Sequence, residues 1–275
     1  MTLSTIRNNP AKQKKVKTKK QKAIAATCAV AFWLLVWHVV SLCVGSELVL
    51  VSPVKVVQTL FTVIFDPDFL KTVWYSAARI LGGFFTALTL GTVLGWVASR
   101  FWVVETLLRP ITAAIKATPV ASFIILVLLW FSGKNLSVII SMLMVFPVIY
   151  MNVLEGIRSA DEKLLEMAQV FRLSVGKKLL YIYLPAVAPF FVSACSVSLG
   201  LCWKSGIAAE VIGTPDGSIG AVFYQAKIFL QTSELLAWTV VVVAVSVAFE
   251  KLFMFLLRLV LKKLKMEDVL NGKRA

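Results

Sequence analysis

The side chains of this 275-residue chain that could carry out covalent or hydrolytic chemistry are few and far apart. The single histidine, His38, lies in an apolar stretch, and one histidine cannot form a metal site. No G-x-x-x-x-G-K-[ST] sequence occurs, so ATP binding by this chain is not predicted. The cysteines form no C-x-x-C pair and are interpreted as buried, inert thiols; they are Cys28, Cys43, Cys195 and Cys202. We predict no catalytic residue, metal or cofactor.

One charged segment, residues 159–185, lies between two strongly apolar stretches and carries a clear helical pattern. Ser159 and Glu162 have the spacing of a capping box, and Ser174 can cap a second helix. Leu184-Pro185 is expected to end this helix pair, and Pro185 can open the fifth span. This pattern fits an ordinary amphipathic loop helix, or a helix pair that docks in a groove of a partner. The apolar face of the first helix is predicted to comprise Leu164, Met167, Ala168 and Phe171.

The same segment resembles the EAA loop of bacterial ATP-binding-cassette importer permeases, and the resemblance extends over about residues 70–260. The family pattern is E-A-A, three residues, Gly, nine residues, then I-x-L-P. Two positions depart from it: Met167 replaces the first Ala, and Arg172 replaces the Gly of the turn, a role that Gly176 nearby could share. The matching residues are Glu166, Ala168, Ile182, Leu184 and Pro185.

The resemblance implies a fold of the type I importer kind and a permease that is not itself an enzyme. A homodimer is implied, with separate ATPase subunits on the cytoplasmic side and a substrate-binding protein outside. Residues 203–220 and the Ser52-Pro53 pair look like the nitrate, sulfonate and taurine subfamily, which implies a small anion as the solute. The residues implied to couple the helix pair to the ATPase are Glu166, Ala168, Arg172, Gly176, Leu184 and Pro185.

The composition requires that these residues be positioned by a membrane-embedded scaffold. Hydrophobic residues make up 59% of the chain and charged residues only 16%, against about 45–50% and about 25% in soluble domains. The net charge of +15 comes from lysines and arginines beside the apolar stretches, which is typical of cytoplasmic loops and does not predict nucleic-acid binding. We therefore predict an all-α integral membrane protein of about six spans.

The apolar stretches and the basic segments define the expected topology of a bacterial inner-membrane protein with both termini in the cytoplasm. Arg100 and Arg109 are expected to bracket a cytoplasmic connection. The expected spans are 23–44, 73–98, 111–131, 136–154, 186–208 and 234–257. The expected regions are a basic tail at 1–22 near anionic lipid, a first span with an external amphipathic helix at 23–72, a permease domain at 73–260 that includes the coupling loop 155–185, and a second basic tail at 261–275.

Ionisable residues and a proline within or beside the spans mark candidates for a translocation pathway. Arg79 and Lys204 could attract an anion, Glu210 lies six residues beyond Lys204, and Pro119 is expected to break the third span. Small residues at every fourth position of the second span, from Gly83 to Ser99, predict close helix packing.

Two other classes of protein remain open at this level. An ion-driven secondary transporter would need acidic residues at the middle of the membrane, and Glu250 is almost the only one within a span. A membrane scaffold or enzyme without transport activity is the third class.

Overall fold

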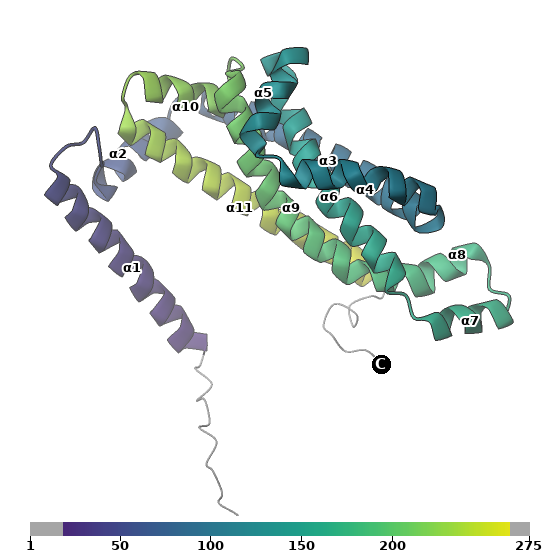
Figure 1. Ribbon diagram of the computed structural model, residues 1–275. Coiled ribbons are helices and arrows are strands. Elements are labelled where there is room, and N and C mark those ends of the chain that lie inside the picture. Colours follow the sequence, from purple (N-terminus) through teal and green to yellow (C-terminus); the bar gives the residue numbers. More distant parts are fainter. Residues whose placement is uncertain (1–18, 265–275) are drawn as a thin grey trace, which may run out of the picture. The chain divides into compact units, whose positions relative to one another are not determined.

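The computed structural model describes residues 19–264, which form helices joined by short connections (Figure 1). The chain divides after Lys55 into two units: the first contains one apolar helix and the second contains a helical bundle. The expected basic tails, 1–22 and 261–275, fall mostly outside the described residues.

The first unit contains one long helix, α1 (Lys19–Val44). Its stretch Thr27–Val44 is long and apolar enough to cross a membrane, as expected for the first span. The helix ends where Gly45 adopts a left-handed φ of 63°, which glycine takes without steric strain. Beyond this turn the Ser41 hydroxyl donates to the Leu50 carbonyl at 3.1 Å and holds the departing chain against the helix end.

Three long helices form the core of the second unit: α3 (Phe69–Arg100), α6 (Gly133–Arg158) and α9 (Leu184–Gly213). Helix α6 packs extensively against both of the others. Because each helix presents apolar side chains to this contact, one cluster spans all three. Its fully buried members include Ile80, Phe84, Ile149, Leu199 and Cys202.

Small residues allow α3 and α6 to approach closely. A Cβ added to Gly91 would lie 3.0 Å from the Cβ of Ile149, and one added to Gly95 would lie 3.0 Å from the Cγ1 of Val153. Van der Waals packing of this kind is the main attraction between helices in lipid. The packing face expected on the second span is thus confirmed.

The third expected span consists of two helices, α4 (Trp102–Ala117) and α5 (Val120–Trp130), which meet at an angle of 110°. The break falls at Thr118-Pro119, as expected, because Pro119 has no N–H to donate to the preceding turn. The bend is much sharper than a proline kink within one continuous helix.

The connection expected between Arg100 and Arg109 is much shorter than the distance between the two arginines along the chain. A single extended residue, Phe101, with φ −122° and ψ 104°, turns the chain from α3 directly into α4. The arginines therefore lie at the end of one helix and within the next, and the basic character of this region does not indicate a loop.

Shorter segments lie at the two ends of α9, and the last long helix runs alongside α9 from one end to the other (Figure 1). At one end, α10 (Ile219–Ile228) and α11 (Thr232–Lys263) pack with α2 (Pro53–Ile64) around the buried residues Val63 and Trp238. At the other end, a hairpin connects α6 to α9 and consists of α7 (Glu162–Val170), α8 (Val175–Lys178) and a π-helical turn, η1 (Leu179–Tyr183). By length and composition the described residues provide five spans, or six if the bent pair α4–α5 is counted as one.

Candidate functional site

The first helix of the hairpin is capped by a different residue from the one expected. The Asp161 carboxylate accepts a hydrogen bond from the Lys163 N–H at 2.9 Å, so Asp161 is the N-cap of α7. Ser159 instead ends α6, where its hydroxyl donates to the Gly156 carbonyl at 2.8 Å. The predicted capping box of Ser159 and Glu162 is therefore wrong, because α7 begins two residues later than the box requires.

The turn of the hairpin depends on Arg172, which has a left-handed φ of 49°. The Leu173 N–H donates to the Ala168 carbonyl at 2.9 Å and the Arg172 N–H donates to the Gln169 carbonyl at 3.0 Å, which together form a Schellman motif. Arg172 thus occupies the position where glycine is usual, at a cost of about 1–2 kcal/mol. Gly176 takes no part in this turn, because it lies within α8.

The hairpin has an inner face that packs on itself and on the start of α9. Ala168 is completely buried there, together with Ala160 and Ile182, and Leu165 and Leu173 surround them. This small core packs α7 against the end of the bundle and the start of α9.

The outer face of the hairpin is apolar and exposed. Phe171 and Val175 are 72% and 79% exposed, and Met167 and Glu166 lie beside them on the surface of α7. The predicted apolar face of α7 is thereby divided, since Ala168 points inward while Met167 and Phe171 point outward. The outer face is the only part of α7 left to contact another molecule.

Pro185 lies in the first turn of α9 and so opens the fifth span, as expected. It does not interrupt the helix, however, contrary to the expectation that Leu184-Pro185 ends the helix pair. Helix α8 continues through η1 into α9, so that Val175–Gly213 is one helix of 39 residues. In the π-helical turn the Leu184 N–H donates to the Leu179 carbonyl, five residues earlier. This wider turn accommodates Pro185, which has no N–H and would crowd the carbonyl of an ordinary preceding turn. Leu184 packs beside Ala188 and Leu261.

At the opposite end of α9, Glu210 is completely buried in a polar network. The Ser76 hydroxyl donates to the Glu210 Oε2 at 2.6 Å and accepts from the Ile219 N–H at 2.9 Å. The Gly220 N–H points to the same carboxylate oxygen at 3.4 Å. The carboxylate therefore lies at the N-terminus of α10, where the helix dipole favours a negative charge.

Arg79 completes the network from α3. Its Nε donates to the Ser137 hydroxyl at 3.1 Å and lies 4.0 Å from the Glu210 Oε1, and its Nη1 donates to the Tyr75 hydroxyl at 2.9 Å. Its Nη2 has no partner within residues 19–264, and neither has the Glu210 Oε1. The pair is thus close but incompletely hydrogen-bonded, and the Arg79 side chain remains 15% exposed.

Gly220 allows α10 to reach the network. A Cβ on Gly220 would collide with the main-chain carbon and the Cβ of Glu210. The approach of α10 to α9 therefore depends on a residue without a side chain.

The structure brings together two of the four pathway candidates. Arg79 and Glu210 meet in one network, whereas Lys204 lies on the exposed side of α9 and Pro119 lies at the bend between α4 and α5. Sequence reasoning did not single out Ser76 or Ser137, because a serine in a transmembrane helix usually bonds to its own backbone. The signal that could have linked Ser76 to the network was its spacing from Arg79, because residues three apart lie on the same face of a helix.

The arrangement contains no recognisable catalytic chemistry. Within the described part of the chain, no three His, Cys, Asp or Glu side chains are grouped so that they could hold a metal ion. What the geometry provides is an exposed apolar surface at one end of a continuous helix and a buried charge pair at its other end.

Comparisons with known proteins agree with these features. The family model for the binding-protein-dependent transport system inner membrane component matches residues 87–266. A candidate aliphatic sulfonates transport permease of Bacillus subtilis (strain 168), SsuC, is 29% identical over 78% of this chain and 78% of its own length. The taurine transport system permease protein TauC of Escherichia coli (strain K12) is 27% identical over 78% of this chain and 80% of its own length.

A solved structure shows the same fold. The crystal structure of an amino acid ABC transporter with histidines matches with a TM-score of 0.50 and 16% identity, and the match covers 70% of this chain and 96% of that chain. The expected fold class, an all-α membrane protein of the type I importer kind, is thereby confirmed.

Proposed function

The chain belongs to the family of binding-protein-dependent transport system inner membrane components, and from this premise we propose that it forms the transmembrane pathway of an ATP-driven importer for a small anion. The resemblance to importer permeases seen in the sequence is thus confirmed. The names of the relatives support a sulfonate, taurine or nitrate-like solute. The chain is a permease component, and ATP hydrolysis is assigned to a separate subunit.

The observation that carries this proposal is the exposed outer face of the hairpin. Apolar side chains such as Phe171 and Val175 are largely in contact with solvent, and exposed apolar patches of this kind mark binding surfaces for other proteins. We assign this face to the groove of an ATPase subunit, with Glu166 at its edge. Ala168, Leu184 and Pro185 would then act indirectly, because they join the hairpin to α9.

The rest of the assembly follows from the same premise. Two copies of this chain would enclose the pathway, an external binding protein would deliver the solute, and both termini would lie on the side of the ATPase. The protein is a multi-pass membrane protein, and we assign it to the bacterial inner membrane. Arg79, Glu210, Lys204 and Pro119 are retained as candidates for the pathway.

Reconstituted transport tests this proposal. The chain would be purified with its ATPase and binding protein, placed in liposomes, and assayed for ATP-dependent uptake of labelled taurine, an alkanesulfonate and nitrate. Glu166→Lys should reduce ATP-dependent uptake about tenfold or more, since it reverses a charge at a surface that must bind another protein. Glu47→Lys, which reverses an exposed charge outside the hairpin, is the matched control and should leave uptake unchanged.

The outcomes separate the classes of transporter. Uptake that continues without ATP but stops when the ion gradient collapses would contradict an ATP-driven importer. Unchanged uptake and unchanged co-purification of the ATPase in Glu166→Lys would contradict the assignment of the hairpin.

A further inference from the structure

The exposed side of α3 is divided lengthwise into two strips of opposite character. One strip is apolar, and its members Trp74 and Phe85 are 75% and 46% exposed, as expected of side chains that face lipid. The other strip is polar or small, and its members recur every three or four residues, so they share one face of the helix. The apolar strip consists of Trp74, Leu81, Phe85 and Trp96. The polar strip consists of Lys71, Tyr75, Arg79, Gly82, Thr86 and Thr89.

The polar strip is open rather than packed against another part of the second unit. A Cβ added to Gly82 would meet no atom within 4 Å, and Thr86 and Thr89 are exposed. From Lys71 to Thr89 the strip extends over 18 residues, or about 27 Å along the helix axis. That length is close to the thickness of the hydrocarbon core, about 30 Å. The Thr86 and Thr89 hydroxyls donate to the Gly82 and Phe85 carbonyls of the same helix at 2.7 and 2.9 Å. The cost of placing the strip against lipid therefore comes mainly from its charged members, Lys71 and Arg79.

The charge of the strip has one sign. Lys71 and Arg79 are its ionisable members besides Tyr75, and no acidic residue lies on it. Glu210 approaches the Nε side of the Arg79 guanidinium from α9, while the buried Nη2 has no partner among the described residues. Ser137 and Tyr75 hold the Arg79 guanidinium in a fixed orientation, and 15% of the Arg79 side chain remains exposed.

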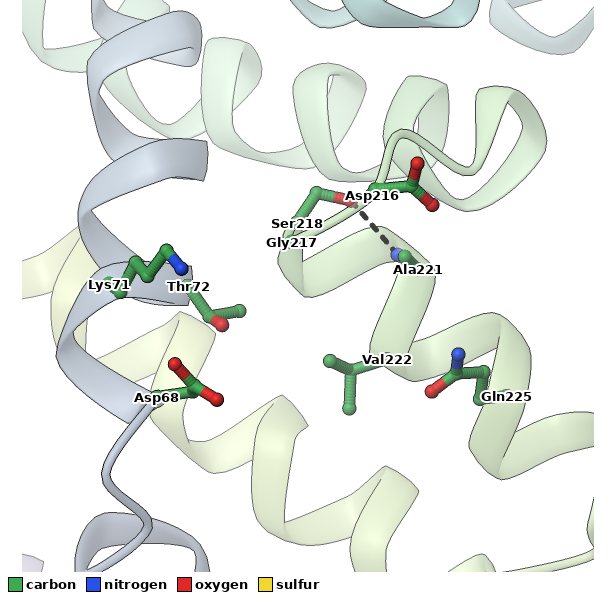
Figure 2. Close-up of a pocket in the computed structure, with 9 residues that line it drawn as sticks. All are labelled: Asp68, Lys71, Thr72, Asp216, Gly217, Ser218, Ala221, Val222 and Gln225. Atoms are coloured by element: carbon green, nitrogen blue, oxygen red, sulfur yellow. Dashed lines mark hydrogen bonds between the residues drawn. The ribbon is translucent and has the colours of Figure 1, made fainter.

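A polar hollow lies where the strip begins (Figure 2). Lys71 and Thr72 of α3 face Ser218 and Gln225 across a pocket of about 270 Å³. The pocket also carries two carboxylates, Asp68 at the start of α3 and Asp216 in the connection after α9. This volume suits a small solute rather than a drug-sized ligand. The strip thus begins at a polar hollow near the N-terminal end of α3, lined by two carboxylates and one lysine, and continues along the helix from there.

We propose that the polar strip of α3 is a wall of the anion pathway and that Arg79 is the cation on this wall that selects for an anion. The proposal rests on the proposed function, since it names the surface along which the solute passes. It requires the strip to face water in the assembled transporter, not lipid and not a second helix.

Cysteine labelling tests whether the strip faces water. The exposed cysteines Cys28 and Cys43 would first be replaced by serine. Single cysteines would then be placed at Thr86 and, as matched control, at the neighbouring Phe85 on the apolar strip. The assembled transporter would be treated with sulfonatoethyl methanethiosulfonate, a small anionic reagent that forms a disulfide with an accessible thiolate and releases methanesulfinate.

We expect Thr86→Cys to react about tenfold or more faster than Phe85→Cys, since only an ionised, water-exposed thiol reacts. Excess taurine or nitrate, whichever the transporter imports, should slow the reaction of Thr86→Cys. Equal rates at the two positions would overturn the proposal. Slow reaction together with disulfide cross-linking between two copies at Thr86→Cys would also overturn it, since the strip would then be a helix contact.

Substitutions on α3 give a second test, and the first of them does not involve Arg79 or the buried network. Thr86→Trp should abolish ATP-dependent uptake by filling the pathway, whereas Phe85→Trp should leave it unchanged. Arg79→Lys keeps the charge opposite Glu210 but loses the guanidinium, so KM for the anion should rise while protein yield is retained. Normal uptake by Thr86→Trp would overturn the proposal. Absence of uptake in the unmodified transporter would instead contradict the proposed function, while the labelling pattern would still test the strip.

Discussion

Replacing Ser76 by alanine isolates the energetic role of the buried network. The Ser76 hydroxyl donates to the completely buried Glu210 carboxylate at 2.6 Å and accepts from the Ile219 N–H at 2.9 Å. Ser76→Ala therefore leaves the carboxylate without this donor and the Ile219 N–H without an acceptor. A hydrogen bond to a charged group contributes about 1.5–3 kcal/mol, and a buried N–H without an acceptor costs about 1–3 kcal/mol. We therefore expect the free energy of unfolding to fall by about 3–5 kcal/mol.

The matched control is Ser198→Ala. Ser198 is as completely buried as Ser76, but its hydroxyl has no hydrogen-bond partner within the part of the chain that the structure describes. Its removal should therefore be nearly neutral. Both substitutions remove one oxygen from a buried position of a long helix, so their difference measures the hydrogen bonds of Ser76 alone.

The buried cysteines supply the assay. Cys195 and Cys202 are completely buried, so after replacement of Cys28 and Cys43 a thiol-reactive fluorescent dye reports unfolding of the core. At about 2–4 °C per kcal/mol for a chain of this size, Ser76→Ala should lower Tm by about 6–20 °C relative to Ser198→Ala. A difference below about 2 °C would refute the reasoning, because the network would then contribute too little to matter.

Two other substitutions test close approach and backbone strain. Gly220→Ala should destabilise the protein by about 1–3 kcal/mol and lower Tm accordingly, because the added Cβ meets Glu210. Gly200→Ala is the control and should leave Tm unchanged, because nothing lies within 4 Å of its added Cβ. The same dye assay compares the two variants. Arg172→Gly should relieve about 1–2 kcal/mol of strain at the left-handed φ of residue 172. Part of this gain is lost because glycine has more conformational freedom in the unfolded chain. The net stabilisation of the turn should slow amide exchange in α7. Faster exchange in Arg172→Gly would contradict this account of the turn.

The hairpin shows how far local sequence rules extend. They predicted two short helices between two spans, because hydrophobic periodicity and capping residues are local signals. They predicted Ser159 rather than Asp161 as the cap of α7, because both are good N-cap residues. In the structure α6 extends to Arg158 and Ser159 caps its end, which leaves Asp161 to cap α7. They also took Pro185 as a helix end, because a π-helical turn depends on the packing of the neighbouring residues and has no simple sequence signal.

The buried network lies beyond such rules for a different reason. Arg79 and Glu210 each stood out as ionisable residues near apolar stretches, but 131 positions separate them in the chain, and nothing local joins them. Ser76 carried no signal of its own. Its role follows from the meeting of α3 with α10, which depends on the absence of a side chain at Gly220.

The π-helical turn at Leu179–Tyr183 has a mechanical consequence. Because it lets the chain pass Pro185 without a break, helical residues run continuously from the hairpin to the end of α9, three residues beyond Glu210. If α9, which has 30 residues and is about 45 Å long, tilts by about 10° around its midpoint, each end moves by about 4 Å in opposite directions. A push on the hairpin would thus arrive as a displacement of Glu210 away from Ser76 and Arg79, without any relay of small side-chain shifts between the two ends.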